Sequence, residues 1–299
     1  KTIKIRSAGT ATITANQAGD SAYNSATAVT QTLTVGYFNL QADSFPGIRL
    51  WLDANNVDGD DTADTIAAGT AIVQWIDKSG NNNHAGQATS SIRPTYKIRN
   101  TGVNYGGGMA EVSFSSSSSS NLDVSGDSNI RSIASVIQIG QAYYSQAKPF
   151  GGDQFLINNR KFTLGAIDSG VDGHSTSVVV WQMVPGAYSI HVDGVNKGSS
   201  TSSLTPAAFN KVGNGASVNI LEVVAYDRAL SDGVRQKLEG YLAHKWANLA
   251  STLPSSHSYK VTKPAFGGAQ ILTFQPVSDK QAGQSADLTI TADSGLTTF

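Results

Sequence analysis

Short apolar segments separated by turn-forming clusters are the feature that most constrains the fold of this chain. Between residues 37 and 268 the apolar segments include ASVIQIG, QFLIN, SVVVWQMV, YSIHVDG and NILEVVAYD, and Gly, Asn, Asp and Ser are frequent between them. Segments of this length and composition are typical of strands in two packed sheets. The central part of the chain is therefore predicted to be an all-β sandwich.

One strand pair is predicted in detail from the segment AYSIHVDGVNKGSS. Tyr188, Ile190 and Val192 alternate with polar residues and so share one face of a strand. Asp193 and Gly194 follow them, and this dipeptide tolerates the positive φ angles that a two-residue hairpin turn requires. The segment is predicted to form a β-hairpin.

The segment SDGVRQKLEGYLAHKWANL predicts one amphipathic helix near the C-terminal end of the sandwich. Ser231 stands where it can cap the first turn, and His244 is predicted to be structural or solvent-facing rather than a ligand. Apolar side chains recur at helical spacing and predict a face packed on a sheet; they are Val234, Leu238, Tyr241, Leu242, Trp246 and Leu249.

Both ends of the chain alternate with period two and predict a few strands each. The alternating segments are TATITA and VTQTLTV in residues 1–36, and ILTFQPV and ADLTITAD in residues 269–299. AGTATITANQAGDSAYNSATAVTQTLTV resembles the second half of the immunoglobulin-like repeats of large bacterial surface proteins, and ILTFQPVSDKQAGQSADLTITADSGL resembles the first half of such a repeat. The resemblance implies immunoglobulin-like half-domains at both termini, the C-terminal half of a repeat at 1–36 and the N-terminal half of another at 269–299.

Half a sandwich exposes strand edges and an apolar face, and both favour a partner. Three arrangements stay open: the halves pair within one chain, they pair between neighbouring copies by strand addition, or each is completed by residues outside this segment. The sequence begins without a basic and apolar leader, so the chain is expected to be mature or excised from a longer one.

Residues 37–268 also carry motifs that resemble a known family. They are LWLDANN at 50–56, VQWIDKSGNNNHAGQ at 73–87, RPTY at 93–96, YSIHVDGV at 188–195 and VVAYDRALSDGVRQKLEGYLAHKW at 223–246. In this order they resemble the laminin-G-like branch of the concanavalin A-like lectin and glucanase fold. The resemblance implies a jelly-roll β-sandwich, and it leaves the function open because this fold serves enzymes, lectins and spacers.

Composition excludes several partners. Charged residues make up 14% of the chain, against roughly 25% in average globular proteins. The 21 basic and 22 acidic residues nearly cancel and show no basic stripe, so we expect no nucleic-acid partner. No apolar run reaches the length of a bilayer span, and cysteine is absent. The polar, weakly charged surface suits an extracellular protein, either on the bacterial cell surface or secreted.

The glutamates argue against an enzyme. Glycosidases of this fold use two closely spaced carboxylates, whereas the three glutamates here, Glu111, Glu222 and Glu239, are scattered along the sequence. No nucleophile elbow and no phosphate-binding loop is present. The chain is predicted to be non-catalytic.

The segment DANNVDGDDTAD, residues 53–64, is the best candidate for a metal site. Calcium prefers six to eight oxygen ligands, and Asn56, Asp58, Asp60 and Asp64 are the predicted side-chain ligands. The spacing does not match an EF-hand. The alternative is a solvated acidic turn stabilised by Asx bonds to its own backbone. Asp77 faces the same choice and is predicted to fix a loop by accepting backbone hydrogen bonds.

A carbohydrate site would need exposed aromatic, amide and carboxylate groups in loops at one rim of the sandwich. Trp51, Trp75, Trp181 and Trp246 stand in apolar segments and are predicted to be core residues. The predicted ligand-binding residues stand in polar, turn-rich segments; they are Tyr143, Tyr144, Asp153, Asn158, Asn159, Asp172 and His174.

Two functions of different class are compatible with this sequence. In the first, the chain is a non-catalytic, lectin-like or adhesive module of a large repetitive bacterial surface protein, and it binds a carbohydrate or another cell-surface ligand. In the second, it is a structural repeat of an extracellular fibre that assembles head to tail by sharing immunoglobulin-like strands.

Overall fold

The structure is a computed structural model that describes residues 9–15, 18–19, 21, 24–35, 47–60, 64–99, 109–140, 147–151, 154–205, 207–214, 216–246, 249–264, 272–274 and 290–292. The chain divides into two compact units. Unit 1 combines the two ends of the chain, Lys1–Leu40 and Ala265–Phe299, and unit 2 is Gln41–Pro264. The sequence-based boundaries 1–36, 37–268 and 269–299 stay a prediction.

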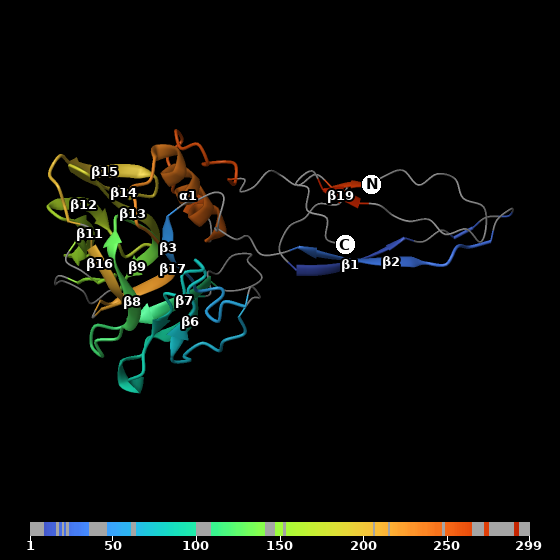
Figure 1. Ribbon diagram of the computed structural model, residues 1–299, viewed down its shortest axis with the longest axis horizontal. Helices are drawn as coiled ribbons and strands as arrows, with labels where there is room; N and C mark the ends of the chain where they lie inside the picture. The colour runs from blue at the N-terminus through green and yellow to red at the C-terminus, as the bar shows by residue number, and fades with distance from the viewer. Residues whose placement is uncertain are drawn as a thin grey trace. The chain divides into compact units, whose positions relative to one another are not determined.

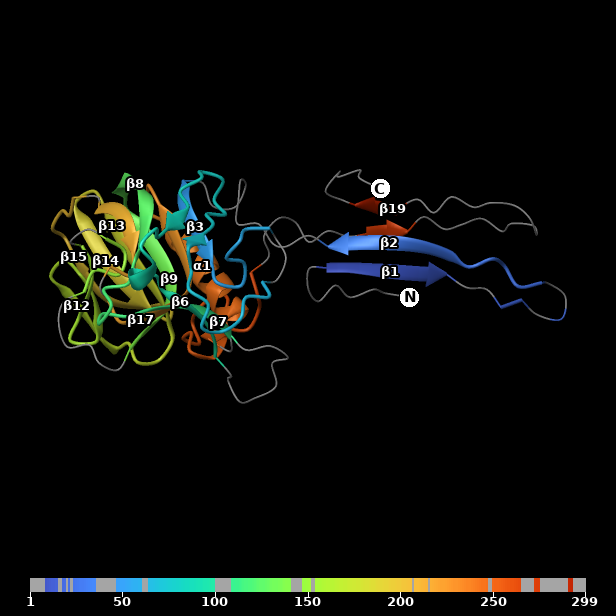
Figure 2. The same cartoon turned by 90° about the horizontal axis from the view of Figure 1, so that it is seen from below.

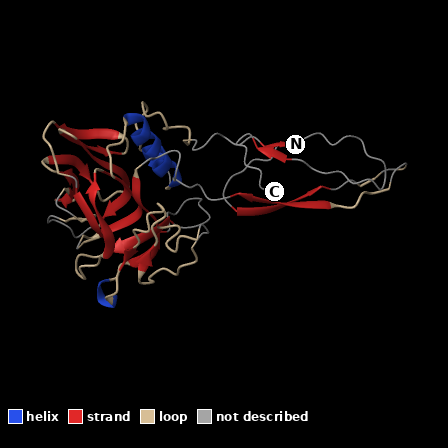
Figure 3. Cartoon of the chain, viewed as in Figure 1, coloured by secondary structure: helices blue, strands red, loops and turns tan. Residues whose placement is uncertain are grey.

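Strands dominate unit 2, as Figure 3 shows. They are β3 (Ile48–Asp53), β4 (Gln74–Trp75), β5 (Ala85–Gly86), β6 (Thr95–Arg99), β7 (Met109–Phe114), β8 (Leu122–Ile130), β9 (Ser132–Ile139), β10 (Phe155–Asn158), β11 (Lys161–Leu164), β12 (Ile167–Asp172), β13 (Ser177–Val184), β14 (Ala187–Val192), β15 (Val195–Ser200), β16 (Ala207–Val212) and β17 (Val218–Tyr226). The helices are α1 (Asp232–Lys245) and the short 3-10 helices η1 (Ser90–Ile92) and η2 (Leu249–Ser251). The all-β prediction with one α-helix near the C-terminal end is confirmed.

An eight-stranded antiparallel sheet forms the centre of unit 2. Its order is β15-β14-β13-β9-β17-β7-β6, and β3 also pairs with β17. One edge of β17 is shared, because Val218–Ile220 pair with β7 while Glu222–Tyr226 pair with β3. The pairing of β17 with β9 shifts register between Ile220 and Glu222. Glu222 therefore stands where the neighbouring strand changes and the ladder is irregular.

Two smaller sheets complete the sandwich, one with the order β16-β8-β5-β4 and one with the order β10-β11-β12. Trp181 of the large sheet meets three phenylalanine rings edge to face, among them Phe155 of β10 and Phe162 of β11. The Trp181 indole N–H donates to the carbonyl of Thr163 in β11, over 3.1 Å. These contacts pack the β10–β12 sheet on the large sheet.

Helix α1 covers part of the large sheet and contacts β9 and β13 (Figures 1 and 2). Strands β9, β13 and β17 are buried almost throughout, which is expected of strands covered on both faces. The Ser231 hydroxyl accepts the N–H of Val234, as the predicted cap requires. The predicted helix face is buried at every position except the half-buried Val234. All four tryptophans are core residues, each at most 1% exposed, as predicted.

The predicted hairpin is confirmed. Strands β14 and β15 pair antiparallel, and Asp193 and Gly194 between them have φ angles of 50° and 76°. Tyr188, Ile190 and Val192 are buried on one face.

The described residues of unit 1 form two antiparallel strand pairs. Strand β1 (Gly9–Ala15) pairs with β2 (Val29–Val35), and β18 (Leu272–Phe274) pairs with β19 (Ile290–Ala292). The predicted strands near both termini are therefore present within one unit of a single chain. Their immunoglobulin-like character stays a prediction. In the part of the chain that the structure describes, no helix is long and apolar enough to cross a membrane.

Candidate functional site

Four of the predicted ligand-binding residues lie at one end of the β10–β12 sheet. Asn158 ends β10 and pairs with Lys161, which in turn pairs with Asp172 at the end of β12. Asn159 occupies the turn between β10 and β11 at a φ angle of 47°, and both asparagines are exposed. The backbone thus places two amides from the β10–β11 connection and one carboxylate from the end of β12 along one rim.

Asp172 is the centre of this rim. Its Oδ1 accepts the backbone N–H of His174 over 3.0 Å and lies 2.8 Å from the imidazole Nδ1 of the same residue. Its Oδ2 lies 3.5 Å from a guanidinium nitrogen of Arg160. The backbone hydrogen bond from His174 holds the pKa of this exposed carboxyl below its ordinary value, and the nearby positive groups add to the effect. Asp172 therefore stays an acceptor for polar ligands over a wide pH range.

We name Asn158, Asn159, Arg160, Asp172 and His174 the polar rim. His174 is half-buried, and its Nε2 is shielded from solvent without a hydrogen-bond partner. The remaining predicted ligand residues, Tyr143, Tyr144 and Asp153, lie outside the described residues. Sequence reasoning missed Arg160, although its position beside Asn159 in a polar turn is visible in the sequence.

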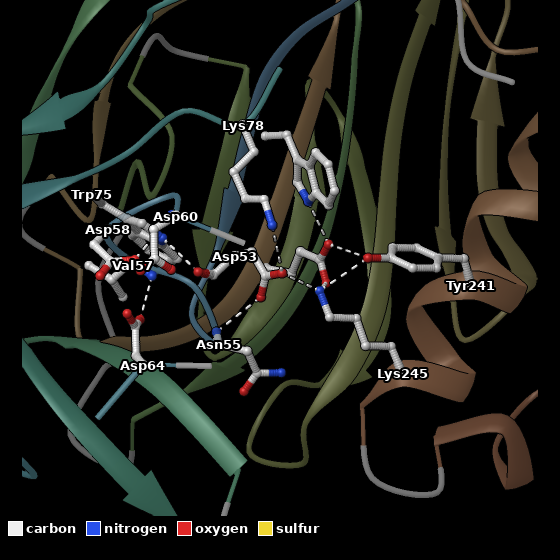
Figure 4. Close-up of polar contacts among 12 residues, drawn as sticks. Asp53, Asn55, Val57, Asp58, Asp60, Asp64, Trp75, Lys78, Tyr241 and Lys245 are labelled. Atoms are coloured by element: carbon white, nitrogen blue, oxygen red, sulfur yellow. Dashed lines mark hydrogen bonds and ion pairs between the residues drawn. The ribbon is translucent and has the colours of Figure 1, made fainter. Parts of the chain in front are cut away.

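The predicted metal-binding loop follows β3. Asp58 and Asp60 are exposed, and the N–H of Asp60 donates to Oδ1 of Asp58 over 3.2 Å. Oδ2 of Asp64 accepts the N–H of Val57 over 2.5 Å (Figure 4). Burial raises the pKa of Asp64 above its ordinary value, and the charge of Asp58 adds to the rise. The structure therefore brings Asp58 and Asp64 close enough to repel each other.

Asn56 differs from the other three predicted ligands because it is only 2% exposed. Its Oδ1 and Nδ2 are both shielded from solvent without a hydrogen-bond partner. Such an orphaned amide is rare and costly in a native protein. Among the described residues, no three Asp, Glu, His or Cys side chains gather in a group that could hold a metal ion. Any cation here would depend on the Asp58, Asp60 and Asp64 carboxylates together with amide and backbone oxygens.

Asp77 fixes the loop after β4, as predicted. Its Oδ1 accepts the backbone N–H groups of Trp51 and Ser79 over 2.9 and 2.8 Å. Its Oδ2 accepts the N–H of Asn83 over 2.9 Å. This carboxylate is occupied by three backbone donors and connects the loop to β3.

A buried cluster of charged residues was not predicted from the sequence. It consists of Asp53 on β3, Glu222 on β17 and Lys245 at the end of α1, and we call it the acid–lysine cluster. Figure 4 labels Asp53 and Lys245 of this cluster. The Lys245 ammonium lies 2.6 Å from Oδ2 of Asp53 and 2.8 Å from Oε2 of Glu222. Asp53 and Glu222 are direct partners on neighbouring strands, which explains why both reach the same lysine.

Aromatic donors surround Glu222. Its Oε1 accepts the Trp51 indole N–H over 2.7 Å and the Tyr241 hydroxyl over 3.0 Å, while its Oε2 accepts the Trp246 indole N–H over 2.5 Å. Burial raises the pKa of Glu222, although Lys245 opposes the rise. For Lys245 burial acts against the charge, but the attraction of Asp53 and Glu222 is stronger and raises its pKa.

The other two glutamates are also committed to the fold. Glu111 is buried and paired with Arg99, whose guanidinium also donates to Thr176 over 2.8 Å. Glu239 is fully buried and accepts two hydrogen bonds from Arg235, at 2.9 and 2.8 Å. His257 adds a third contact to Glu239 over 3.1 Å. Each of the three glutamates is therefore buried and paired with a cation.

Comparisons with known proteins give fold likenesses only. No family model matches the sequence, and no curated protein matches it. Among solved structures, the chain is similar to a Trypanosoma rangeli sialidase in complex with sialic acid, with 14% identity and a TM-score of 0.40 over 68% of this chain. The matched part spans 34% of that sialidase, so the chain corresponds to about a third of its length.

Two further structures are similar at the same low level. One is domain 4 of the GH43 extracellular arabinanase AbnA from Geobacillus stearothermophilus in complex with arabinotriose, with 16% identity and a TM-score of 0.38, over 63% of this chain and 96% of that domain. The other is the binding domain of Paraclostridial Mosquitocidal Protein 1, with 12% identity and a TM-score of 0.38, over 58% of this chain and 51% of that one.

Proposed function

We propose that this chain is a non-catalytic, lectin-like binding module of an extracellular bacterial protein, and that the polar rim binds a carbohydrate. The observation that carries the proposal is that Asn158 and Asn159, at the β10–β11 connection, and Asp172, at the end of β12, lie at one end of the β10–β12 sheet. Exposed amides and a charged acceptor on a rigid sheet are the groups that orient polar ligands.

A glycan array with the folded chain tests the proposal, and binding of at least one glycan above background is expected. Asp172→Asn should weaken that binding about tenfold or more, because a charge-assisted hydrogen bond is replaced by a neutral one. Asp168→Asn is the matched control, since both aspartates lie on β12, are equally exposed at 53% and lie 3.5 Å from a cation. Background binding throughout the array, or equal losses in both variants, would contradict the proposal.

Absence of catalysis is part of the same proposal. It is supported by the burial of Glu111, Glu222 and Glu239, which are 3%, 0% and 0% exposed and so do not reach a substrate as general acids. Incubation of the chain with the glycans that it binds should leave them intact by mass spectrometry. Hydrolysis that survives removal of contaminating enzymes would overturn this part.

We also propose a calcium ion at the loop after β3. The support is the buried, unpaired Asn56 amide together with the repulsion between Asp58 and Asp64, which a cation would relieve. Calcium should raise the melting temperature of the chain, and the paired change Asp58→Ala and Asp60→Ala should abolish the rise. No calorimetric heat and no change in melting temperature would remove calcium from the proposal.

The fibre function is the second candidate. It is supported by the fact that unit 1 is built from the two ends of the chain. Its described strand pairs β1–β2 and β18–β19 come from opposite ends of one chain, and a two-stranded sheet by itself is marginal in water. Exchange of these pairs between copies would join units head to tail. Concentration-dependent oligomers in light scattering would support this assembly, and a single monomeric species at high concentration would contradict it.

A further inference from the structure

We propose that Lys245 and Asp53 condense to an intramolecular amide bond inside unit 2, and that Glu222 is the catalytic proton acceptor. The inference does not depend on the proposed carbohydrate site, because the acid–lysine cluster lies on β3, β17 and α1 rather than on the β10–β12 sheet.

Contact between the reacting groups is the first support. Lys245 Nζ lies 2.6 Å from Oδ2 of Asp53, and the two residues are held there by β3 and by the last turn of α1 (Figure 4). Both belong to regular elements of a packed domain, so the amine is kept at the carboxyl group. Such fixed proximity replaces a bimolecular encounter and lowers the barrier for bond formation.

Burial of the cluster is the second support. The side chains of Asp53, Glu222 and Lys245 are 7%, 0% and 18% exposed. The indole of Trp246 and the ring of Tyr241 lie beside the amine, with Nζ 5.1 and 5.4 Å from their centroids. A site with so little water protects an amide bond, once it is formed, against hydrolysis.

The polar contacts of Asp53 fit the two roles of its oxygens. Oδ1 accepts the backbone N–H of Asn55 over 3.0 Å, which suits the oxygen that becomes the amide carbonyl and carries charge in the tetrahedral intermediate. Oδ2 faces the amine and lies 4.0 Å from the Lys78 ammonium, which suits the oxygen that leaves. The leaving oxygen is thus placed next to positive charge.

The step balances without any further reactant. Glu222 Oε2, 2.8 Å from Nζ, takes a proton from the ammonium, and the neutral amine attacks the carboxyl carbon of Asp53. The C–N bond forms, and the bond from carbon to Oδ2 breaks. Oδ2 leaves as water with two protons from the former ammonium, one of them returned by Glu222. Glu222 ends as it began, and the raised pKa that burial gives it suits a proton acceptor.

A second lysine provides the comparison. Lys211 also contacts an aspartate, Asp123, but these side chains are 35% and 59% exposed. Among the side chains that the structure describes, Lys211 contacts Asp123 and the amide oxygen of Asn121, and these include no second carboxylate that could take the proton. The conditions for condensation therefore meet at Lys245 and not at Lys211.

The mass of the intact, denatured chain tests the proposal. We expect the recombinant 299-residue protein, once folded, to be lighter than its sequence by one water molecule. A tryptic digest should contain residues 50–78 joined to residues 238–260, with no cleavage after Lys245. A folded protein with the full sequence mass and two separate peptides would overturn the proposal.

Variants assign the roles. Glu222→Gln keeps the size of the side chain but not the proton acceptor, and Lys245→Arg keeps the charge but not the primary amine; both should show the full mass. Asp53→Asn should condense with loss of ammonia and reach the mass of the cross-linked wild type. Lys211→Arg should retain the loss of water. An undiminished loss of water in Glu222→Gln would overturn its catalytic role, and circular dichroism verifies that each variant is folded.

Discussion

At the scale of single residues, buried charges organise this molecule more than its low content of charged residues suggests. Glu239 is fully buried, and Arg235 beside it is 8% exposed. The N–H of Tyr259 donates to Nδ1 of His257 over 3.2 Å, so the proton of a neutral His257 lies on Nε2 and points at Glu239. This arrangement satisfies the carboxylate from α1 and from the segment after η2.

Glu239→Gln should therefore destabilise the fold strongly. The change leaves the buried Arg235 guanidinium without its buried charge partner, and removal of one member of a buried pair costs about 3–5 kcal/mol. Asp232→Asn is the control, because Asp232 also contacts Arg235, over 3.2 Å, but is 88% exposed. It should cost less than about 1 kcal/mol. Urea denaturation gives both values, and equal losses would contradict the role of burial.

His191 predicts a pH dependence of stability. Burial lowers its pKa below the ordinary value of 6.5 and Arg235 adds to the effect, whereas Glu239 and Asp232 oppose it. The folded state therefore takes up the proton at lower pH than the unfolded chain. The contribution of neutral His191 to the free energy of unfolding is therefore complete above pH 6.5, the ordinary pKa. It is lost as the pH falls from 6.5 toward the lower pKa that His191 has in the folded state.

His191→Leu removes this titration. Between about pH 7.5 and pH 5.5, the free energy of unfolding of the wild type should fall relative to that of the variant. Denaturant titrations of both proteins at the two pH values measure the difference. Other titrating groups act on both proteins alike, so curves that run parallel would contradict the assignment.

At the scale of elements, the sequence predicted correctly those features that depend on residues close to one another in the chain. The Asp193–Gly194 turn, the Ser231 cap and the apolar face of α1 all depend on residues close in sequence, and the structure contains each of them. The acid–lysine cluster depends instead on strand register. Glu222 and Trp51 are 171 residues apart in the sequence. The pairing of β3 with β17 that brings them together cannot be predicted from a local sequence pattern.

The candidate binding sites show the same division. Sequence reasoning selected Asn158, Asn159, Asp172 and His174 as polar turn residues, but it had no means to place them together at one rim. The order of β10, β11 and β12 does so. The same reasoning treated the side chains of the acidic loop alike, although Asn56 is buried and Asp58 is exposed, because burial depends on what packs over each residue.

Alanine substitutions at two glycines in the turns beside β14 distinguish the cost of backbone strain from the cost of a steric clash. Gly186 and Gly194 have nearly equal φ angles of 79° and 76°. A Cβ on Gly186 would meet nothing within 4 Å, whereas one on Gly194 would lie 2.7 Å from His257 and 3.1 Å from Leu253. Gly186→Ala should cost about 1–2 kcal/mol, because an L-residue is strained in the left-handed region.

Gly194→Ala should cost about 1 kcal/mol more than Gly186→Ala, because the new methyl group also displaces the segment after η2. Thermal or urea denaturation of the two variants gives the difference directly. Equal losses would mean that the segment around His257 yields without cost.

At the scale of the whole molecule, the two units differ in how the chain builds them. Unit 2 is one continuous stretch, Gln41–Pro264, and unit 1 is assembled from the two segments that flank this stretch in the sequence. The contact between Asp53 and Lys245 joins residues 192 positions apart, on β3 and on α1. A covalent bond there would link the two ends of unit 2. A stretching force applied to the chain ends would then be carried by this bond and not by the strands between Asp53 and Lys245.

A chain cut to residues 41–264 should therefore keep the fold of unit 2. Its sheets, α1 and the acid–lysine cluster all lie inside this stretch, and a continuous segment of this size with its own core folds alone. Calorimetry of the full chain should show a transition that the shortened chain reproduces within about 4 °C, a shift that corresponds to roughly 1 kcal/mol. The shortened chain should also bind the same glycans, because the polar rim is complete in it. A shortened chain that melts far lower would mean that unit 2 depends on the ends, and the division of roles between the two units would be wrong.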